Sequence, residues 1–334
     1  MATTNLTNML QKAFIGGYAV GAFNINNDLQ AQAIFRAAYE LNSPLIVQAS
    51  KGACVFQGEA KDPKNSTIKE LTRGARRIGM LAAATAQSYP NLDYVLHLDH
   101  GANLDIVMAC VESGFSSVMI DGSELDTLEK NINLTREVVK EVRKYGLEHK
   151  TPITVEGELG TLGGKSHSGG KGQIEYAQPS QVVDFVRETG IDALAIAWGT
   201  RHGANKGNGG ELDLRPEVIG ECKSALIDAG LTCYLVSHGS STVPEKYVKI
   251  INQHLGYLQT MGIPKGQVEE AIRQGAVKVN IDTDLRLACT AEIRHIFDEK
   301  RDVIDPRDYL IPARQAMYEA VKECIQSFGS ANKI

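Results

Sequence analysis

The 334-residue sequence lacks the features that mark membrane, nucleic-acid-binding and secreted proteins. No apolar run approaches the roughly 20 residues of a membrane-spanning helix. The net charge is only −5 and no block of Lys and Arg is present, so neither a membrane nor nucleic acid is an expected partner. The N-terminus, MATTNLTNMLQKAF, has no basic stretch followed by an apolar one, which argues against a signal peptide. The six cysteines include no CxxC pair, so we expect reduced thiols and a cytoplasmic location.

The composition is otherwise that of an ordinary folded chain, with 43% hydrophobic and 22% charged residues. Eight short apolar segments recur, and each is β-branched or small in its middle, as in parallel strands buried on both faces. They span residues 18–24, 44–50, 94–100, 117–122, 152–158, 193–199, 233–238 and 277–282. Helical periodicity appears between them, at residues 28–41, 66–88, 125–145, 180–189, 216–229 and 283–297.

This alternation predicts an α/β fold, a single (β/α)8 TIM barrel over residues 1–334. Residues 247–266 add length as an insertion between the seventh and eighth strands, and residues 298–334 form a C-terminal extension with extra helices. An open doubly wound sheet is the alternative, but no GxGxxG motif follows the first predicted strand. In a barrel, the active site lies at the C-terminal ends of the strands.

Polar residues that an apolar strand would not otherwise carry stand at these ends. They are Asn24, Ser50, Asp99, His100, Asp121, Glu156, Glu158, Arg201, His202, His238, Asn280 and Asp282. Three of them, His100, His202 and His238, directly precede glycine and follow a predicted strand. Three imidazoles from three strand ends are typical of a catalytic zinc site with an open position. The alternative is that each histidine only caps a strand or donates to a loop carbonyl.

Carboxylates accompany the histidines. Consecutive strand residues point in opposite directions, so we expect either Asp99 or His100 to lie past the end of its strand. Glu156 and Glu158 share a face by the same alternation. Such carboxylates serve as metal ligands, as orienters of histidine or as acid/base groups. For Asp121, a simple helix N-cap is an equal alternative.

Other features bear on substrate binding. The segments 238–241 (HGSS) and 280–284 (NIDTD) offer backbone N–H groups after the last two strands, where barrels often bind phosphate. The glycine-rich segment 160–172 is either a mobile lid or a plain surface loop. A Schiff-base enzyme would need a lysine at a strand end. Lys278 on the eighth strand keeps that alternative open, whereas Lys51 is expected in a loop.

At these motifs the chain resembles the class II, metal-dependent fructose-bisphosphate aldolases. The resemblance runs from the first predicted strand to the C-terminus. Its motifs are AFNINN (22–27), HLDHG (97–101), SVMIDGS (117–123), EGELGTLGG (156–164), GTRHGANKG (199–207), HGSS (238–241), VNIDTDLRLA (279–288) and DPRDYLIPAR (305–314). Their combination in this order is highly specific.

The resemblance implies a role for each matching residue. His100, His202 and His238 would hold the catalytic divalent ion, Asp99 would be the proton donor, and Asp121 and Glu158 would hold or approach a second metal. The substrate site would include Asn24, Ser50 on the glyceraldehyde-3-phosphate side, and Lys206. The dihydroxyacetone-phosphate site would be Gly203, Gly239, Ser240, Ser241, Asn280, Ile281, Asp282 and Thr283. Arg286 and Arg307 would contact the second phosphate, one of them in a neighbouring subunit.

One segment departs from the family pattern. Acidic residues usually follow the GG of ELGxxGG, and one of them is the base at C3, but here Lys165, Ser166 and His167 stand there. His167 is the expected base, since imidazole titrates near neutral pH, and Glu175 is the alternative.

The resemblance implies a sugar bisphosphate substrate, cleaved in glycolysis and gluconeogenesis. Tagatose 1,6-bisphosphate is the rival of fructose 1,6-bisphosphate. Related tagatose enzymes tend toward NVATEL where this chain has NIDTDL at 280–285. Zinc is the expected metal, although imidazole also suits iron or cobalt. A second divalent ion, K+ or Na+, and a homodimer or homotetramer are further expectations. A metal-dependent hydrolase and a non-enzymatic binding barrel are the weaker alternatives.

Overall fold

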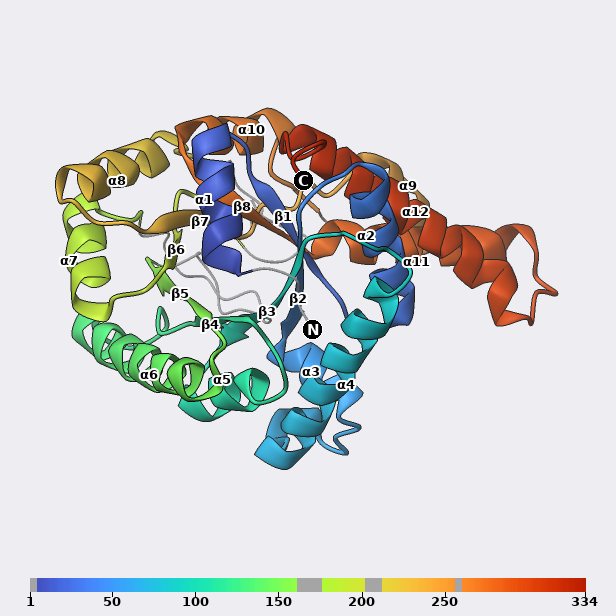
Figure 1. The fold of residues 1–334 in the computed structure, drawn as a ribbon. Helices are drawn as coiled ribbons and strands as arrows, with labels where there is room; N and C mark the ends of the chain where they lie inside the picture. Colours follow the sequence, from blue (N-terminus) through green and yellow to red (C-terminus); the bar gives the residue numbers. More distant parts are fainter. Residues whose placement is uncertain (1–4, 161–175, 202–211, 256–259) are drawn as a thin grey trace.

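The protein is represented by a computed structural model that describes residues 5–160, 176–201, 212–255 and 260–334. Eight parallel strands form a closed barrel in sequence order, and β1 pairs with both β2 and β8 (Figure 1). This confirms the predicted fold class and the strand count. The strands are β1 (Val20–Asn24), β2 (Leu45–Ser50), β3 (Tyr94–Gly101), β4 (Ser117–Ile120), β5 (Thr154–Leu159), β6 (Ala193–Ile196), β7 (Tyr234–Ser237) and β8 (Ala276–Ile281).

Helices surround the barrel (Figure 1). Six of them match the predicted segments: α2 (Asp28–Glu40), α4 (Ile68–Ala86), α6 (Leu128–His149), α7 (Pro179–Thr189), α8 (Glu217–Asp228) and α11 (Thr283–Glu299). The described chain adds α1 (Leu6–Gly16), α3 (Lys51–Gln57), the 3₁₀ helix η1 (Pro63–Asn65), α5 (Leu104–Val111), α9 (Glu245–Leu255), α10 (Lys265–Gln274) and α12 (Pro306–Ser327). Lys51 therefore begins a helix, and its prediction as a loop residue was wrong. Among the described residues, every helix is too short or too polar to cross a bilayer.

The N-terminal helix closes one end of the barrel. Leu6, Met9 and Leu10 of α1 belong to a buried apolar cluster with residues at the starts of the strands, among them Ile46 and Val95. A second and larger cluster fills the space between the strands and the outer helices. The end of the barrel where the strands begin is thus filled with apolar side chains. The polar residues predicted at the strand ends therefore lie at the opposite end of the barrel, where the strands end.

Helices α11 and α12 form an antiparallel hairpin that projects away from the barrel (Figure 1). Near its tip the rings of Phe297 and Tyr309 pack with centroids 4.9 Å apart. Ile304, in the connection between the two helices, is 90% exposed. The C-terminal extension predicted from the sequence therefore contains a protruding element that exposes Ile304 at its tip, among the charged residues of segment 298–305.

Candidate active site

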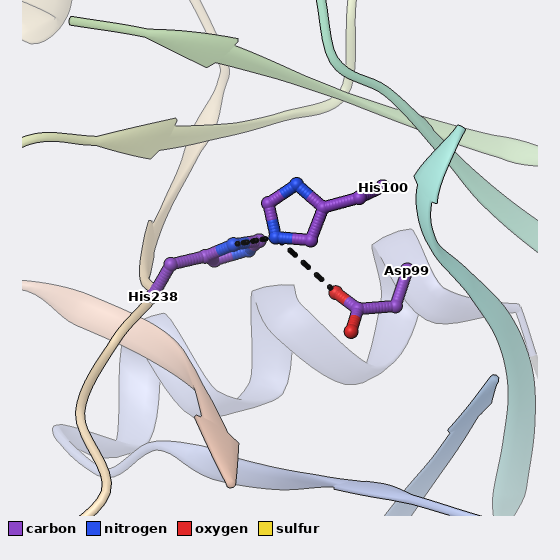
Figure 2. A group of neighbouring side chains, drawn as sticks. All are labelled: Asp99, His100 and His238. Atoms are coloured by element: carbon purple, nitrogen blue, oxygen red, sulfur yellow. Dashed lines mark hydrogen bonds and ion pairs between the residues drawn. The ribbon is translucent and has the colours of Figure 1, made fainter. Parts of the chain in front are cut away.

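Two imidazoles meet at the C-terminal end of the barrel. His100 lies on β3 and His238 directly follows β7, and Nε2 of His100 is 3.1 Å from Nδ1 of His238 (Figure 2). Asp99 Oδ1 lies 3.8 Å from the same His100 nitrogen. These three side chains place their ligand atoms within 4.8 Å of one another.

Carboxylates fix which nitrogen of each imidazole faces the other. Nδ1 of His100 is 2.8 Å from Asp121 Oδ2, and Nε2 of His238 is 2.8 Å from Glu156 Oε1. Each carboxylate must accept an N–H, so the proton lies on that nitrogen and the opposite nitrogen presents its lone pair. The lone pairs of His100 and His238 therefore point at one position.

The donor set fits a divalent metal ion. Two ligands about 2.0–2.1 Å from a tetrahedral zinc ion lie about 3.3 Å apart, close to the 3.1 Å between the two imidazole nitrogens. Burial lowers the pKa of His238, which keeps this ring neutral, as a metal ligand must be. Burial would also lower the pKa of His100, but the three surrounding carboxylates raise it to about 10. This negative surrounding favours a cation at the position that the imidazoles face.

The local backbone brings Asp99 and His100 to the same side of the barrel wall. Both residues lie within β3, so the expectation that one would lie past the strand end was wrong. His100 has φ +54°, and the register between β3 and β4 shifts between Leu98 and Gly101. A residue in the left-handed region breaks the regular alternation of a strand. This local irregularity allows two consecutive side chains to face the site.

A second group of possible ligands lies beside the first. His100, Asp121 and Glu158 place their ligand atoms within 4.8 Å of one another. Burial, and next the charge of Asp121, raise the pKa of Glu158 well above its usual value. Within the described chain, Glu158 Oε2 has no hydrogen-bond partner. The same oxygen lies 3.5 Å from Nδ1 of His100, and a buried carboxyl group beside Asp121 and an imidazole suits a second cation.

Asp121 does not cap the following helix. Its Oδ1 accepts hydrogen bonds from the backbone N–H and hydroxyl of Ser123, whereas Thr127 caps α6. The N-cap alternative for Asp121 is therefore wrong. The carboxylate instead orients His100.

Asp99 is held by two amide side chains. Asn24 Nδ2 donates to Oδ2 at 2.8 Å, and Asn280 Nδ2 donates to Oδ1 at 3.1 Å. Burial alone would raise the pKa of Asp99, but the imidazoles of His100 and His238 and the Asn24 amide lower it to about 2. The carboxylate is therefore charged, buried and fixed in position beside the two imidazoles.

The loop after β7 has an unusual backbone. Gly239 has φ +62°, and a Cβ there would lie 2.6 Å from the carbonyl oxygen of Arg201, so only glycine fits. Val243 also has a positive φ, +51°, which is rare for a β-branched residue. The buried carboxylate of Asp284 holds it there by accepting the N–H groups of Thr242 and Val243 at 2.9 and 2.8 Å.

The other residues predicted to bind substrate lie partly at the strand ends, partly on exposed helix starts and partly outside the described residues. Ser240, Ser241, Asn280 and Ile281 are buried at the strand ends, Thr283 begins α11, and Ser50 ends β2 and caps α3 through Ala53 N–H. Arg286 pairs with Asp282 at 2.6 Å on the exposed start of α11. Arg307, at the start of α12 on the protruding hairpin, is 82% exposed.

Some predicted site residues lie outside the described residues. They are His202, Gly203, Lys206, His167, Glu175 and all but the first residue of the glycine-rich segment 160–172.

Several residues support the site in roles that the sequence left open for Glu156, assigned only as a Schiff-base alternative for Lys278, and did not assign at all for Gln48. Glu156 orients His238, Gln48 donates to Asn24 at 2.7 Å, and Lys278 reaches both Glu156 and Asn280. Their positions on the strands were predictable, because period-two alternation assigns them to the barrel interior. Their partners lie on other strands, so only the closed barrel identifies them.

A closed parallel barrel whose strand ends carry imidazoles and carboxylates that could hold a divalent ion has the architecture of a metal-dependent barrel enzyme. The family model described as "Fructose-bisphosphate aldolase class-II" matches residues 4–333. The chain therefore belongs to the class II fructose-bisphosphate aldolases, which are metal-dependent lyases.

Relatives and solved structures agree with this assignment. The fructose-bisphosphate aldolase of Giardia intestinalis is 38% identical over 332 residues, covering 99% of this chain and 94% of that protein. The Treponema pallidum enzyme of the same name is 37% identical over 347 residues, covering 99% and 98%. The crystal structure of the YdjI aldolase from Escherichia coli superposes with a TM-score of 0.71 at 25% identity, covering 100% and 99%. Fructose-bisphosphate aldolase from Campylobacter jejuni has a TM-score of 0.75 at 23% identity, covering 98% and 95%, which supports the fold alone.

Proposed function

We propose that this chain catalyses the reversible cleavage of fructose 1,6-bisphosphate to dihydroxyacetone phosphate and glyceraldehyde 3-phosphate, the aldolase step of glycolysis and gluconeogenesis. The observation that supports it most is the facing pair of imidazoles, 3.1 Å apart, next to a carboxylate that two amides hold in place. A metal-binding position and an acid/base group are thus adjacent, as a metal-dependent aldol reaction requires.

Zinc is the metal we propose, held by His100 and His238 together with His202. When bound, the ion supplies Lewis-acid polarisation of the C2 carbonyl of the substrate. Asp121 and Glu156 keep the two described imidazoles in the tautomer that binds metal. His100, Asp121 and Glu158 are the proposed ligands of a second divalent ion. A dependence on K+ or Na+ rests on the family resemblance alone.

Asp99 is the proposed acceptor of the C4 hydroxyl proton in cleavage and its donor in condensation. Its two oxygens each accept one amide N–H. Each oxygen keeps lone-pair capacity for a substrate hydroxyl, since an ionised carboxylate accepts about four hydrogen bonds. Fixing the carboxylate before substrate binds lowers the cost of reaching the reactive arrangement.

The loops after β7 and β8 are proposed to bind the phosphate groups of the substrate. Gly239, Ser240 and Ser241 follow β7, and Asp282 and Thr283 lead into α11, whose first backbone N–H groups suit an anion. Asn24, Ser50, Gly203, Lys206 and Arg286 complete the proposed substrate site. Correct placement of both phosphates would position the C3–C4 bond against Asp99 and the metal.

His167 is the proposed base at C3, and Glu175 is the alternative. Replacing His167 by Ala is expected to lower kcat roughly 100-fold, the lower range for loss of a general base. Solvent-proton exchange at C3 of dihydroxyacetone phosphate, followed by NMR, should fall with it, because that exchange needs only the C3 base. A parallel Glu175→Gln variant distinguishes the two residues. Normal exchange in His167→Ala and lost exchange in Glu175→Gln would transfer the role to Glu175.

Metal removal tests the proposed function itself. Cleavage of fructose 1,6-bisphosphate is measured before chelation, after chelation and after zinc is restored, with tagatose 1,6-bisphosphate in parallel. We expect chelation to lower activity by roughly 10²–10⁴-fold, corresponding to several kcal/mol of carbonyl polarisation, and zinc to restore it. Cleavage that survives complete metal removal would contradict the metal mechanism. Faster turnover of tagatose 1,6-bisphosphate would change the substrate assignment.

The protein is also proposed to be a cytoplasmic homodimer or homotetramer, with the α11–α12 hairpin as an interface element. All six cysteines are free thiols, in keeping with a reducing compartment. The hairpin projects from the barrel and exposes Ile304 at its tip, with Arg307 beside it. From this position Arg307 would reach the substrate site of a neighbouring subunit.

Replacing Ile304 by Glu tests the interface. If the interface buries Ile304, a charge in its place is expected to weaken the dimer at least about 10-fold, as for one unpaired buried charge, while circular dichroism stays unchanged. Sedimentation velocity over a concentration series measures the effect. Ile227→Glu, at a residue 58% exposed on the outer helix α8, is the control. An Ile304 variant that sediments as the wild type would exclude the hairpin tip from the interface.

A further inference from the structure

The barrel interior beneath the metal-facing histidines contains a buried lysine. Lys278 on β8 is 0% exposed. Its Nζ lies 2.9 Å from Glu156 Oε2 and 2.8 Å from Asn280 Oδ1. Barrel interiors are usually filled by branched apolar side chains, and a buried ammonium group is costly unless it is paired and hydrogen-bonded. The position of Lys278 therefore calls for an explanation beyond packing.

The lysine determines how the Asn280 amide is oriented. An ammonium group has three donors and no acceptor, so the oxygen of Asn280 must face Lys278. The amide nitrogen then faces Asp99 Oδ1, to which it donates at 3.1 Å. The reverse orientation would place an amide N–H₂ against the ammonium and a carbonyl oxygen against the carboxylate. Lys278 thus makes Asn280 a hydrogen-bond donor to Asp99.

A second chain of contacts runs from the same ammonium group to His238. The Glu156 carboxylate pairs with Lys278 through Oε2, and its Oε1 lies 2.8 Å from Nε2 of His238. The contact with Lys278 fixes the orientation of the carboxylate, so that one oxygen faces the ammonium group and the other faces His238. Glu156 therefore accepts the His238 N–H and leaves Nδ1 facing His100.

We propose that Lys278 is a positioning residue for the aldolase reaction, an inference that rests on the proposed function. Through Asn280 it fixes the carboxylate of Asp99, and through Glu156 it fixes the imidazole of His238, without itself contacting the substrate. The same geometry argues against a Schiff base on this lysine. A Schiff-base amine must be neutral and must reach the substrate carbonyl, whereas Nζ of Lys278 is buried between Glu156 and Asn280.

The decisive variant is Lys278→Met combined with Glu156→Gln. Lys278→Met alone leaves a buried carboxylate unpaired and is at risk of misfolding. In the double variant, the amide introduced at position 156 is neutral and its oxygen can still accept the His238 N–H, so only the restraint on Asn280 is lost. Glu156→Gln alone is the control for the change at position 156; it leaves the buried ammonium group of Lys278 without its carboxylate, so its folding must be verified in the same way. Each protein is loaded with zinc, and its metal content and circular dichroism are compared with those of the wild type.

Two reactions separate positioning of Asp99 from general damage. Cleavage of fructose 1,6-bisphosphate needs the C4 hydroxyl proton acceptor, whereas solvent-proton exchange at C3 of dihydroxyacetone phosphate does not. Relative to Glu156→Gln, we expect the double variant to lose roughly 10–100-fold in cleavage kcat, the usual range for a residue that orients a catalytic group. The rate of proton exchange and the zinc content of the double variant should stay within about threefold of those of Glu156→Gln.

Three results would overturn the proposal. Cleavage within about threefold of the Glu156→Gln control would show that Asn280 needs no lysine. Exchange that falls in parallel with cleavage would show that Lys278 supports the whole site rather than Asp99. Borohydride trapping of dihydroxyacetone phosphate on Lys278 of the wild type would make it a covalent residue. Failure of the proposed function is distinct, because the zinc-loaded wild type would then neither cleave the sugar nor catalyse the exchange.

Discussion

Replacing Asp99 by Asn is expected to lower kcat for cleavage of fructose 1,6-bisphosphate by about 10²–10⁴-fold, the range that a positioned proton-transfer group contributes. Asn has nearly the same shape but cannot accept a proton. Asp99 lies 3.8 Å from Nε2 of His100, the nitrogen proposed to bind the metal, and is fixed by Asn24 and Asn280. The loss should therefore appear in kcat rather than in KM, because the residues proposed to bind the substrate phosphates are other than Asp99.

The same variant should retain solvent-proton exchange at C3 of dihydroxyacetone phosphate to within about tenfold of the wild type. This exchange involves dihydroxyacetone phosphate alone, which lacks the C4 hydroxyl group on which Asp99 is proposed to act. Asp105→Asn, in the first turn of α5, is the control and should cleave normally. Cleavage by Asp99→Asn within about threefold of wild type would rule out Asp99 as the proton acceptor. Loss of exchange and cleavage together would assign Asp99 to metal or substrate binding.

The barrel could be predicted because its strands have a strong local signature. Parallel strands covered on both faces are continuously apolar, and each of the eight predicted segments overlaps an observed strand. The missed α5 shows the limit of this pattern. Its sequence, LDIVMACV, is short and apolar on nearly every side, so it lacks the periodicity that distinguishes a helix from a buried strand.

The site could be predicted only where a residue type signals chemistry by itself. The histidine-glycine pairs and strand-end carboxylates identified His100, His238, Asp99, Asp121 and Glu158 as candidates, and the structure brings all five together. The turn of His100 into the left-handed region could not be predicted, since it depends on the register between β3 and β4.

The contacts of Lys278 with Glu156 and Asn280 could not be predicted from the sequence either. Lys278 and Glu156 are 122 positions apart in the chain and meet only when the barrel closes. By itself, a lysine on a strand suggests an edge residue or a Schiff base. Its partners make it a donor to an amide and a carboxylate. The chemistry of such a residue is set by contacts across the barrel, which no local pattern reports.

Replacing His238 by Ala is expected to remove the metal and lower cleavage at least about 10³-fold, since several kcal/mol of carbonyl polarisation depend on the bound ion. His97→Ala is a matched control, because the chain offers two fully buried imidazoles near the same carboxylate. His238 contacts Glu156 at 2.8 Å and faces His100, whereas His97 lies 3.7 Å from Glu156 and pairs with the Ser117 hydroxyl.

Both substitutions delete an imidazole of equal size from the barrel interior and should cost similar amounts of stability through the cavity they leave. Only His238→Ala should lose zinc, measured by elemental analysis after gel filtration, and added zinc should not restore its activity. Burial lowers the pKa of His97 to about 3, so this ring is neutral and its loss changes no charge at the metal position. If His97→Ala lost zinc as completely as His238→Ala, metal binding would depend on packing of the whole barrel interior rather than on the facing pair of imidazoles. If His238→Ala kept its zinc and its activity, the metal would have to lie elsewhere among the strand-end ligands.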